Sequence, residues 1–391
     1  MAKSALPYAA MIIVISTLAF IRPYDNADMV GYIACTIPSN DFQQINRDTY
    51  SALESSVVPR HFRLLTGLNP GEQNRHAKST ELAEVQLFYS IKPLYIIAIQ
   101  VLHLFGISSV RATYLISALG YLGAGWLLWK WIGWPAYVVM IAPPIIGLVR
   151  YSTPDGMNLL LAMTGFYLIG ERRWYVRGAA FLLVCVWVRP DMLILSGLTF
   201  VALWLTRKID FVELCTLSVL AVISYWTIMH VSGNYGWSVL FAHSFYSAAH
   251  VTTPGEQIFH ITPQMYITTF FNNLRPLELV NLTDIGAVQS GLAIFVLLAT
   301  LAIKRQRDPV YRALTLATLF SMAIHYLLFP SPDFRYFAPM SLFQVVSFVC
   351  SFEPNGEAVS TEGGEAGSIL KDQGNIDIAP GQALVVIKAS S

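Results

Sequence analysis

Charged residues are scarce in this sequence. Of its 391 residues only 13% are Asp, Glu, Lys or Arg, whereas a soluble domain carries about 25%. Hydrophobic residues make up 55% of the chain, which excludes an ordinary soluble enzyme and indicates an integral membrane protein. The formal net charge of +1 provides no basic surface for nucleic acid, so we expect no nucleic-acid partner.

Cysteine is also scarce, and its spacing carries no metal or disulfide motif. Three of the four cysteines fall inside apolar runs, and no C-x-x-C pair occurs. The histidines of the second long polar loop, His243, His250 and His260, have no partner at helical spacing. The sequence therefore predicts neither a thiolate site nor a histidine metal site.

Long apolar runs separated by short polar turns predict an all-α, polytopic membrane protein with about ten transmembrane helices. The runs lie near residues 7–21, 111–129, 134–149, 157–170, 174–188, 191–206, 211–231, 285–303, 310–329 and 336–352. Several are shorter than the roughly 20 residues of a straight span. We expect one transmembrane domain over residues 1–352, followed by a flexible tail over 353–391.

Basic turns give the orientation, because cytoplasmic loops carry an excess of Lys and Arg. The turns are Arg172, Arg173 and Arg177; Arg207 and Lys208; and Lys304, Arg305 and Arg307. Two spans separate each cluster from the next, so all three share one side, which we take as the cytoplasm, together with the tail. The loops 22–90 and 232–284 then lie outside.

The same count of spans leaves no room for segment 91–105 to cross the membrane, so we expect it to be an interfacial or re-entrant helix on the outer side. If it crossed the membrane, the basic turns would face outward, which is the less favoured alternative. Because the inner loops are short and the outer loops long and polar, we expect the functional site on the outer face.

Two acids follow the first apolar run directly, Asp25 and Asp28. They are either solvated loop acids that end a helix or a general base for an acceptor hydroxyl. Helical spacing would place Asp28 and Tyr32 on one face. Lys92 begins the segment 91–105, where it either extends its ammonium to the interface or binds a phosphate.

The remaining candidates lie in three outer turns. Arg150 and Asp155 flank a Pro-Gly turn, where they either cap helices or supply a carboxylate for a divalent metal or for acceptor orientation. Arg189 and Asp191 either neutralise each other in a tight hairpin or take part in the site. The fifth candidate, Arg335, is suited to clamp a phosphate with two hydrogen bonds.

Taken in order, these motifs resemble the C-type (GT-C fold) superfamily of glycosyltransferases, most closely the branch with protein O-mannosyltransferases and lipid A aminoarabinose transferases. The likeness covers roughly residues 8–350 and rests on order and spacing. It is carried by Asp25-Asn-Ala-Asp28 with Tyr32; Lys92-Pro-Leu-Tyr95; Arg150-Tyr-Ser-Thr-Pro-Asp155; and Asp333-Phe-Arg-Tyr336.

The resemblance implies an inverting transferase that moves a sugar from a polyprenyl-phosphate donor to a hydroxyl of a glycan, lipid or protein acceptor. It implies Asp28 as the base, with Asp25 as the alternative, and Asp155 as a further acid. Lys92 and Arg335 would bind the donor phosphate. The supporting residues would be Tyr32, Arg150, Arg189 and Tyr336. The resemblance implies no specific cofactor, and a divalent metal stays an open alternative.

Short loops and modest length favour a bacterial inner (cytoplasmic) membrane, with membrane lipids around the spans and the site on the periplasmic face. Two other functions fit the same hydropathy. One is a transporter or flippase of lipid-linked glycan, which predicts paired broken helices near the bilayer centre. The other is a surface-polysaccharide polymerase or ligase, which predicts several arginines in the large outer loop, whereas loop 232–284 has only Arg275.

Overall fold

A computed structural model of the chain describes residues 2–67, 70–246, 261–274, 296–331 and 333–352. Within these ranges the chain is helical and its one β-type pairing is an isolated bridge between Tyr24 and Tyr151. The predicted all-α class is therefore confirmed for this part of the chain. The tail 353–391, His250, His260 and the first part of the expected span 285–303 lie outside the described residues.

The described residues form the following helices. They are α1 (Ala2–Ile21), α2 (Asp28–Ala34), α3 (Phe42–Ser56), α4 (Pro59–Gly67), α5 (Pro70–Ala77), α6 (Ser79–Tyr89), α7 (Pro93–Leu104), α8 (Ser109–Ile132), α9 (Pro135–Met140), α10 (Pro143–Arg150), α11 (Asp155–Gly170), α12 (Tyr175–Val188), α13 (Met192–Leu205), α14 (Phe211–Val231), α15 (Trp237–Tyr246), α16 (Pro263–Leu274), α18 (Pro309–Leu328), the 3-10 turn η2 (Phe334–Tyr336) and α19 (Ala338–Cys350). Residues 296–305 are also helical.

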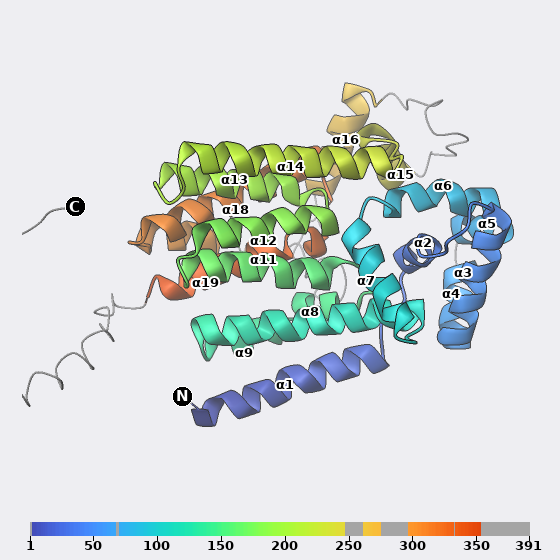
Figure 1. Cartoon of the computed structure of the whole chain (residues 1–391), viewed down its shortest axis with the longest axis horizontal. Coiled ribbons are helices and arrows are strands. Elements are labelled where there is room, and N and C mark those ends of the chain that lie inside the picture. The colour runs from blue at the N-terminus through green and yellow to red at the C-terminus, as the bar shows by residue number, and fades with distance from the viewer. Residues whose placement is uncertain (1, 68–69, 247–260, 275–295, 332, 353–391) are drawn as a thin grey trace, which may run out of the picture. The chain divides into compact units, whose positions relative to one another are not determined.

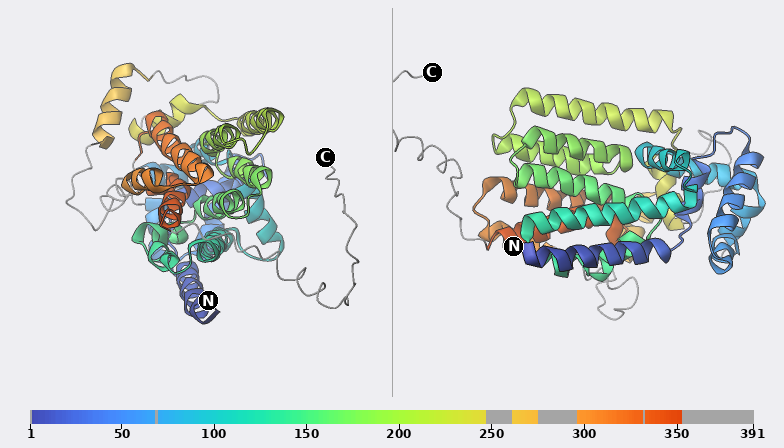
Figure 2. Two further views of the ribbon diagram at one scale, coloured as in Figure 1. Left: turned by 90° about the vertical axis from the view of Figure 1, so that its left-hand side faces the viewer. Right: turned by 60° about the horizontal axis from the view of Figure 1, so that its bottom comes forward.

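The long apolar helices α1, α8, α11, α12, α13, α14, α18 and α19 lie side by side and form a bundle (Figures 1 and 2). Aromatic and aliphatic side chains fill its core, among them Tyr121, Phe166, Phe200 and Phe343. Two helices, α8 and α14, are long and apolar enough to cross a membrane, and the pair α6–α7 would be a third if it forms one broken span. Shorter apolar helices include residues Ala5–Ile21, α12, α13 and α19.

Close packing of α8 against α11 depends on two glycines. A Cβ on Gly120 would overlap the backbone carbonyl of Gly156, and a Cβ on Gly156 would lie 2.8 Å from the Cα of Ser117. Because neither residue has a side chain, the two helix backbones come into direct contact at this crossing. This crossing lies next to the first turn of α11 and thereby fixes the position of Asp155.

Residues 134–149 do not form the single helix that the sequence predicts, so that prediction is wrong. The chain forms α9 and α10 instead, interrupted around Ala142. Two prolines, Pro143 and Pro144, follow the break, and a proline disfavours helical geometry in the residue before it. Ala142 accordingly has an extended backbone, with φ −61° and ψ 132°.

The predicted outer loop 22–90 is a helical cap. Helices α2 to α6 gather at one end of the bundle (Figure 1), around an apolar core that includes Met29, Ile33, Leu53 and Leu82. The segment expected to be interfacial or re-entrant corresponds to α7, which is bent by 112° from α6. Part of the other predicted outer loop, 232–284, also packs here, because Val239 of α15 contacts Phe88 of α6.

Candidate functional site

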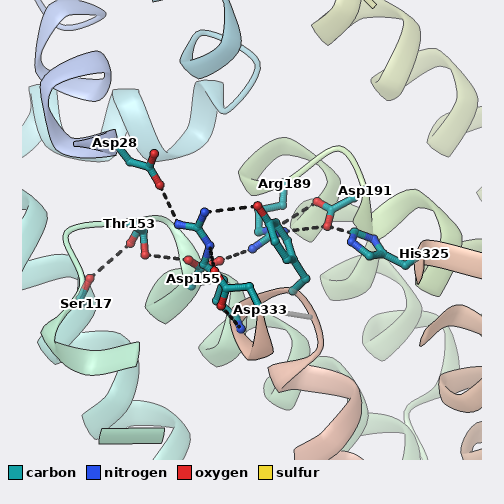
Figure 3. A network of polar contacts seen from close by, with 10 residues as sticks. Asp28, Ser117, Thr153, Asp155, Arg189, Asp191, His325 and Asp333 are labelled. Atoms are coloured by element: carbon teal, nitrogen blue, oxygen red, sulfur yellow. Dashed lines mark hydrogen bonds and ion pairs between the residues drawn. The ribbon is translucent and has the colours of Figure 1, made fainter. Parts of the chain in front are cut away.

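The candidate residues lie where helices of the bundle and of the cap begin or end, at the end of the bundle that carries the cap. Asp28 begins α2 and Asp155 begins α11, while Arg189 follows the last residue of α12. Arg335 lies in η2, directly before α19. Segments more than 300 residues apart in sequence therefore meet, and Figure 3 shows the carboxylates of Asp28, Asp155, Asp191 and Asp333 directed into one network of polar contacts.

Asp28 is held between two partners. Its Oδ2 lies 2.6 Å from Nη1 of Arg335, and its Oδ1 accepts a hydrogen bond of 3.0 Å from the hydroxyl of Tyr89. Burial by itself raises the pKa of this carboxyl, but the Arg335 guanidinium and its hydrogen bond outweigh burial, so the pKa of Asp28 is lowered. Asp28 is therefore a carboxylate at neutral pH.

Arg335 also has a second acidic neighbour and an aromatic one. Its Nε lies 2.8 Å from Oδ2 of Asp333, in an ion pair without hydrogen-bond geometry, and its Nη2 donates to the hydroxyl of Tyr336 at 3.2 Å. The guanidinium groups of Arg335 and Arg189 lie 5.1 Å and 4.7 Å from the centre of the Tyr336 ring. Tyr336 thus connects the two arginines through cation–π contacts.

Arg189 forms the buried centre of the second half of the network. Its Nε and Nη2 bind the two oxygens of Asp191 at 3.1 and 2.8 Å, in a forked pair, while Nη1 binds Asp155. The second oxygen of Asp155 accepts from the Thr153 hydroxyl at 2.7 Å. On the far side of Asp191, Nδ1 of His325 lies 3.6 Å from Oδ2. Arg189 therefore holds the carboxylates of Asp191 and Asp155 in place. Of the two roles that the sequence offers for Arg189, this contact with Asp191 is the mutual neutralisation in a tight hairpin.

Lys92 lies in the break between α6 and α7, with its ammonium 4.9 Å and 5.3 Å from the centres of the Tyr32 and Tyr89 rings. Burial lowers the pKa of Lys92 to about 8, although the negative charge of Asp28 acts in the opposite direction. Among the described residues no carboxylate lies within 4 Å of this ammonium. The hydroxyl of Tyr95, whose ring packs edge-on against Tyr32, is buried with no hydrogen-bond partner among the described residues. The cluster thus combines a cation without a counter-ion and an unpaired hydroxyl.

Two predicted residues lie elsewhere. The oxygens of Asp25 are bound by the Tyr114 hydroxyl and by Nδ1 of His61, the latter at 2.5 Å. Arg150 is exposed, and its Nε donates to the backbone carbonyl of Arg22 at 3.3 Å. Both residues line a cleft beside the cap instead of the network around Asp28. Arg150 therefore lies outside the network around Asp28, and Asp25 already has a partner for each oxygen.

The donor set does not fit a divalent metal. Both oxygens of Asp155 accept hydrogen bonds, from Arg189 and Thr153, so a metal would have to displace a buried guanidinium. Within the described ranges no three His, Cys, Asp or Glu side chains are grouped to hold a metal ion. We therefore derive no step through a metal.

Tyr89 and His325 belong to no motif of the sequence, whereas Asp333 opens the motif that contains Arg335. Tyr89 faces Gly31, where a Cβ would overlap the tyrosine ring, so this glycine is what admits the ring beside Asp28. Neither position has a signal of its own in the sequence, because a lone tyrosine and a lone histidine in apolar segments usually belong to the core.

Comparison with protein-family models, with curated proteins and with solved structures gives no match for this chain.

Proposed function

We propose that the protein is a membrane-embedded, inverting glycosyltransferase that moves a sugar from a polyprenyl-phosphate donor to a hydroxyl of a glycan, lipid or protein acceptor. The observation that carries this proposal is the juxtaposition of Lys92, a cation without a counter-ion, with the ionised carboxylate of Asp28. A phosphate needs the first group and a reacting hydroxyl needs the second.

In the proposed reaction Lys92 and Arg335 bind the donor phosphate. The acceptor oxygen attacks the anomeric carbon, the bond from that carbon to the phosphate oxygen breaks, and the hydroxyl proton passes to Asp28. The lipid phosphate leaves with the bonding electron pair, and its charge is neutralised by the two cations. Phosphate is a good leaving group, so orientation and charge neutralisation supply most of the catalysis.

The ion pair between Asp28 and Arg335 gives this reaction an order. While the carboxylate is paired with the guanidinium at 2.6 Å, its pKa is lowered and it is a weaker base toward a hydroxyl. A donor phosphate competes for the same guanidinium, and its binding releases Asp28. Donor binding therefore precedes activation of the acceptor.

The proposed membrane arrangement takes the bundle helices as spans, about ten in all, in a bacterial cytoplasmic membrane. The turns with Arg173 and with Arg307 lie at the end of the bundle opposite the cap, and Nη2 of Arg173 pairs with Asp308 at 2.5 Å. Basic turns at that end support a cytoplasmic side there. The cap and the Asp28 network then face the periplasm.

The direct test is transfer of labelled sugar from a polyprenyl-phosphate sugar to a panel of hydroxyl acceptors by the purified protein. Asp28→Asn removes the base and should reduce the rate by about 10²- to 10⁴-fold. Lys92→Ala should raise the KM for the donor. Asp48→Asn, an acid on the surface of α3 with 45% of its side chain exposed, is the matched control and should transfer normally.

The outcomes separate the proposal from its rivals. Normal transfer by Asp28→Asn would remove this residue from the mechanism, and absence of transfer with every donor would reject the class. If Asp28→Asn abolishes transfer but lipid-linked sugar still moves across vesicle membranes, the movement belongs to a separate activity. Movement without any transfer by the wild type would favour a flippase.

A further inference from the structure

A second cluster of cations lies beside the cap, outside the Asp28 network. Arg22, Arg111 and Arg150 line a cleft of about 660 Å³ between the end of α1, the α3–α4 junction and the start of α8. This volume lies within the range of roughly 300–1,000 Å³ that is typical of ligand sites. An adjoining hollow of about 470 Å³ shares Phe20, Ser56 and Arg111 with it.

The cleft has an excess of positive charge. Its lining holds three arginines and a single acid, Asp25. That acid is 3% exposed and is bound by Tyr114 and His61, so it lies in the wall and not in the opening. Within the described residues no carboxylate lies within 4 Å of any of the three guanidinium groups. Arginines without counter-ions in a concave site are suited to bind a phosphate group through paired hydrogen bonds.

Apolar residues also line the cleft, among them Phe20, Ile21, Val57 and Val58, and those at the end of α1 continue onto the surface of the bundle. Ile21 is 65% exposed at the mouth of the cleft, and it continues an exposed stripe of Val14 and Leu18 along α1, at the spacing of one helix face. Leu104 and Phe105 at the end of α7, which precede the Gly106 and Ile107 of the adjoining hollow, are 84% and 79% exposed. An exposed apolar stripe that ends in a cationic cleft matches an amphiphile with an anionic head.

We propose that this cleft binds the phosphate headgroup of an anionic membrane lipid, whose acyl chain lies along the Val14–Leu18–Ile21 stripe of α1. The three arginines neutralise the phosphate, and the apolar rim covers the glycerol and the first part of the chain. The bound lipid would stabilise the junction between the cap and the bundle, because the cleft is lined from both. The proposal rests on the membrane location of the bundle and is independent of the transfer reaction.

The experiment titrates delipidated protein in detergent with phosphatidylglycerol and counts bound lipids by native mass spectrometry. Phosphatidylcholine, which carries a compensating positive charge, and inorganic phosphate, which has no chain, are titrated in parallel. Arg111→Gln removes a guanidinium with no hydrogen-bond partner among the described residues, and Arg150→Gln is the second variant. Arg63→Gln, an exposed arginine of α4 outside the cleft, is the matched control.

Phosphatidylglycerol should bind the wild type and Arg63→Gln equally, and each cleft variant about tenfold more weakly, since one charged hydrogen bond is removed. Arg335→Gln should bind it as the wild type does, which separates this cleft from the proposed donor site. Equal affinity in the wild type and both cleft variants would overturn the proposal. Binding of inorganic phosphate as tight as that of the lipid would overturn the role of the α1 stripe, and equal binding of phosphatidylcholine would overturn selection for an anionic headgroup.

Discussion

Separating Asp28 from Arg335 should reveal a strong coupling between two residues 307 positions apart in the sequence. At an effective dielectric constant of about 20, opposite unit charges 2.6 Å apart attract by roughly 6 kcal/mol. Desolvation of both groups removes most of this energy. Breaking a fully buried pair costs about 3–5 kcal/mol, whereas exposed pairs contribute about 0.2–1 kcal/mol.

The two side chains are 26% and 22% exposed, so the pair lies between these limits. We expect a coupling free energy of about 2 kcal/mol in a double-mutant cycle of Asp28→Asn and Arg335→Gln. The measurement is chemical unfolding in mixed micelles at pH 7. Because the pKa of Asp28 is lowered in the folded state, this stability is present above the ordinary Asp pKa and is lost as pH falls through the folded value. The coupling should therefore begin to weaken as the pH falls below the ordinary Asp pKa of about 3.9, and it should disappear only below the lowered pKa of folded Asp28.

The ion pair between Arg173 and Asp308 at the opposite end of the bundle is the matched control. Its N–O distance is 2.5 Å, but the Arg173 side chain is 45% exposed, so its coupling should be about 0.5 kcal/mol. If the Asp28–Arg335 coupling is no larger than this control, or if it does not change with pH, the assignment of a half-buried, coupled pair is wrong.

Three further predictions follow from single contacts. Burial lowers the pKa of Lys92 to about 8, so kcat/KM for the donor should fall as the pH rises through 8. Lys92→Arg should move that fall to higher pH. An unchanged pH profile in this variant would exclude Lys92 from phosphate binding. Arg189→Met leaves the carboxylates of Asp155 and Asp191 without their cation and should lower the unfolding free energy by about 3–5 kcal/mol. A loss of less than about 1 kcal/mol would show that the two carboxylates have other partners. Gly120→Ala should lower the unfolding free energy by about 1–3 kcal/mol, because the added Cβ overlaps Gly156. Gly197→Ala, with open space around it, should stabilise α13 by roughly 0.5–1 kcal/mol. Equal effects of the two substitutions would argue against the close crossing of α8 and α11.

The acids after the first apolar run illustrate how far sequence reasoning reaches. The sequence identifies Asp25 and Asp28 as candidates, but their three-residue separation does not decide which one meets the cations. In the structure a short non-helical link carries Asp25, and α2 begins at Asp28. The two carboxylates therefore face different partners, Tyr114 and His61 for one, Arg335 for the other. Helix initiation between the two residues decides the choice.

Arg189 illustrates the opposite case, in which the local pattern already contains the answer. Its position two residues before Asp191 in a tight hairpin predicts a neutralising pair, and the structure has that pair. The sequence does not predict that Asp155, from the neighbouring helix hairpin, shares the same guanidinium. That contact depends on the close glycine crossing of α8 and α11, which no local pattern reveals.

The sequence by itself determined the helical class, the positions of most long helices and the motif residues, because apolar periodicity, prolines and capping residues act over a few neighbouring positions. Tertiary structure alone decided that the outer loop 22–90 is a packed cap, that Tyr89 and His325 join the network, and that Asp25 and Arg150 belong to a separate cleft. Each of these depends on side chains from distant helices meeting at one end of the bundle. Such meetings are set by helix packing, and helix packing is a property of the whole chain and not of any one segment.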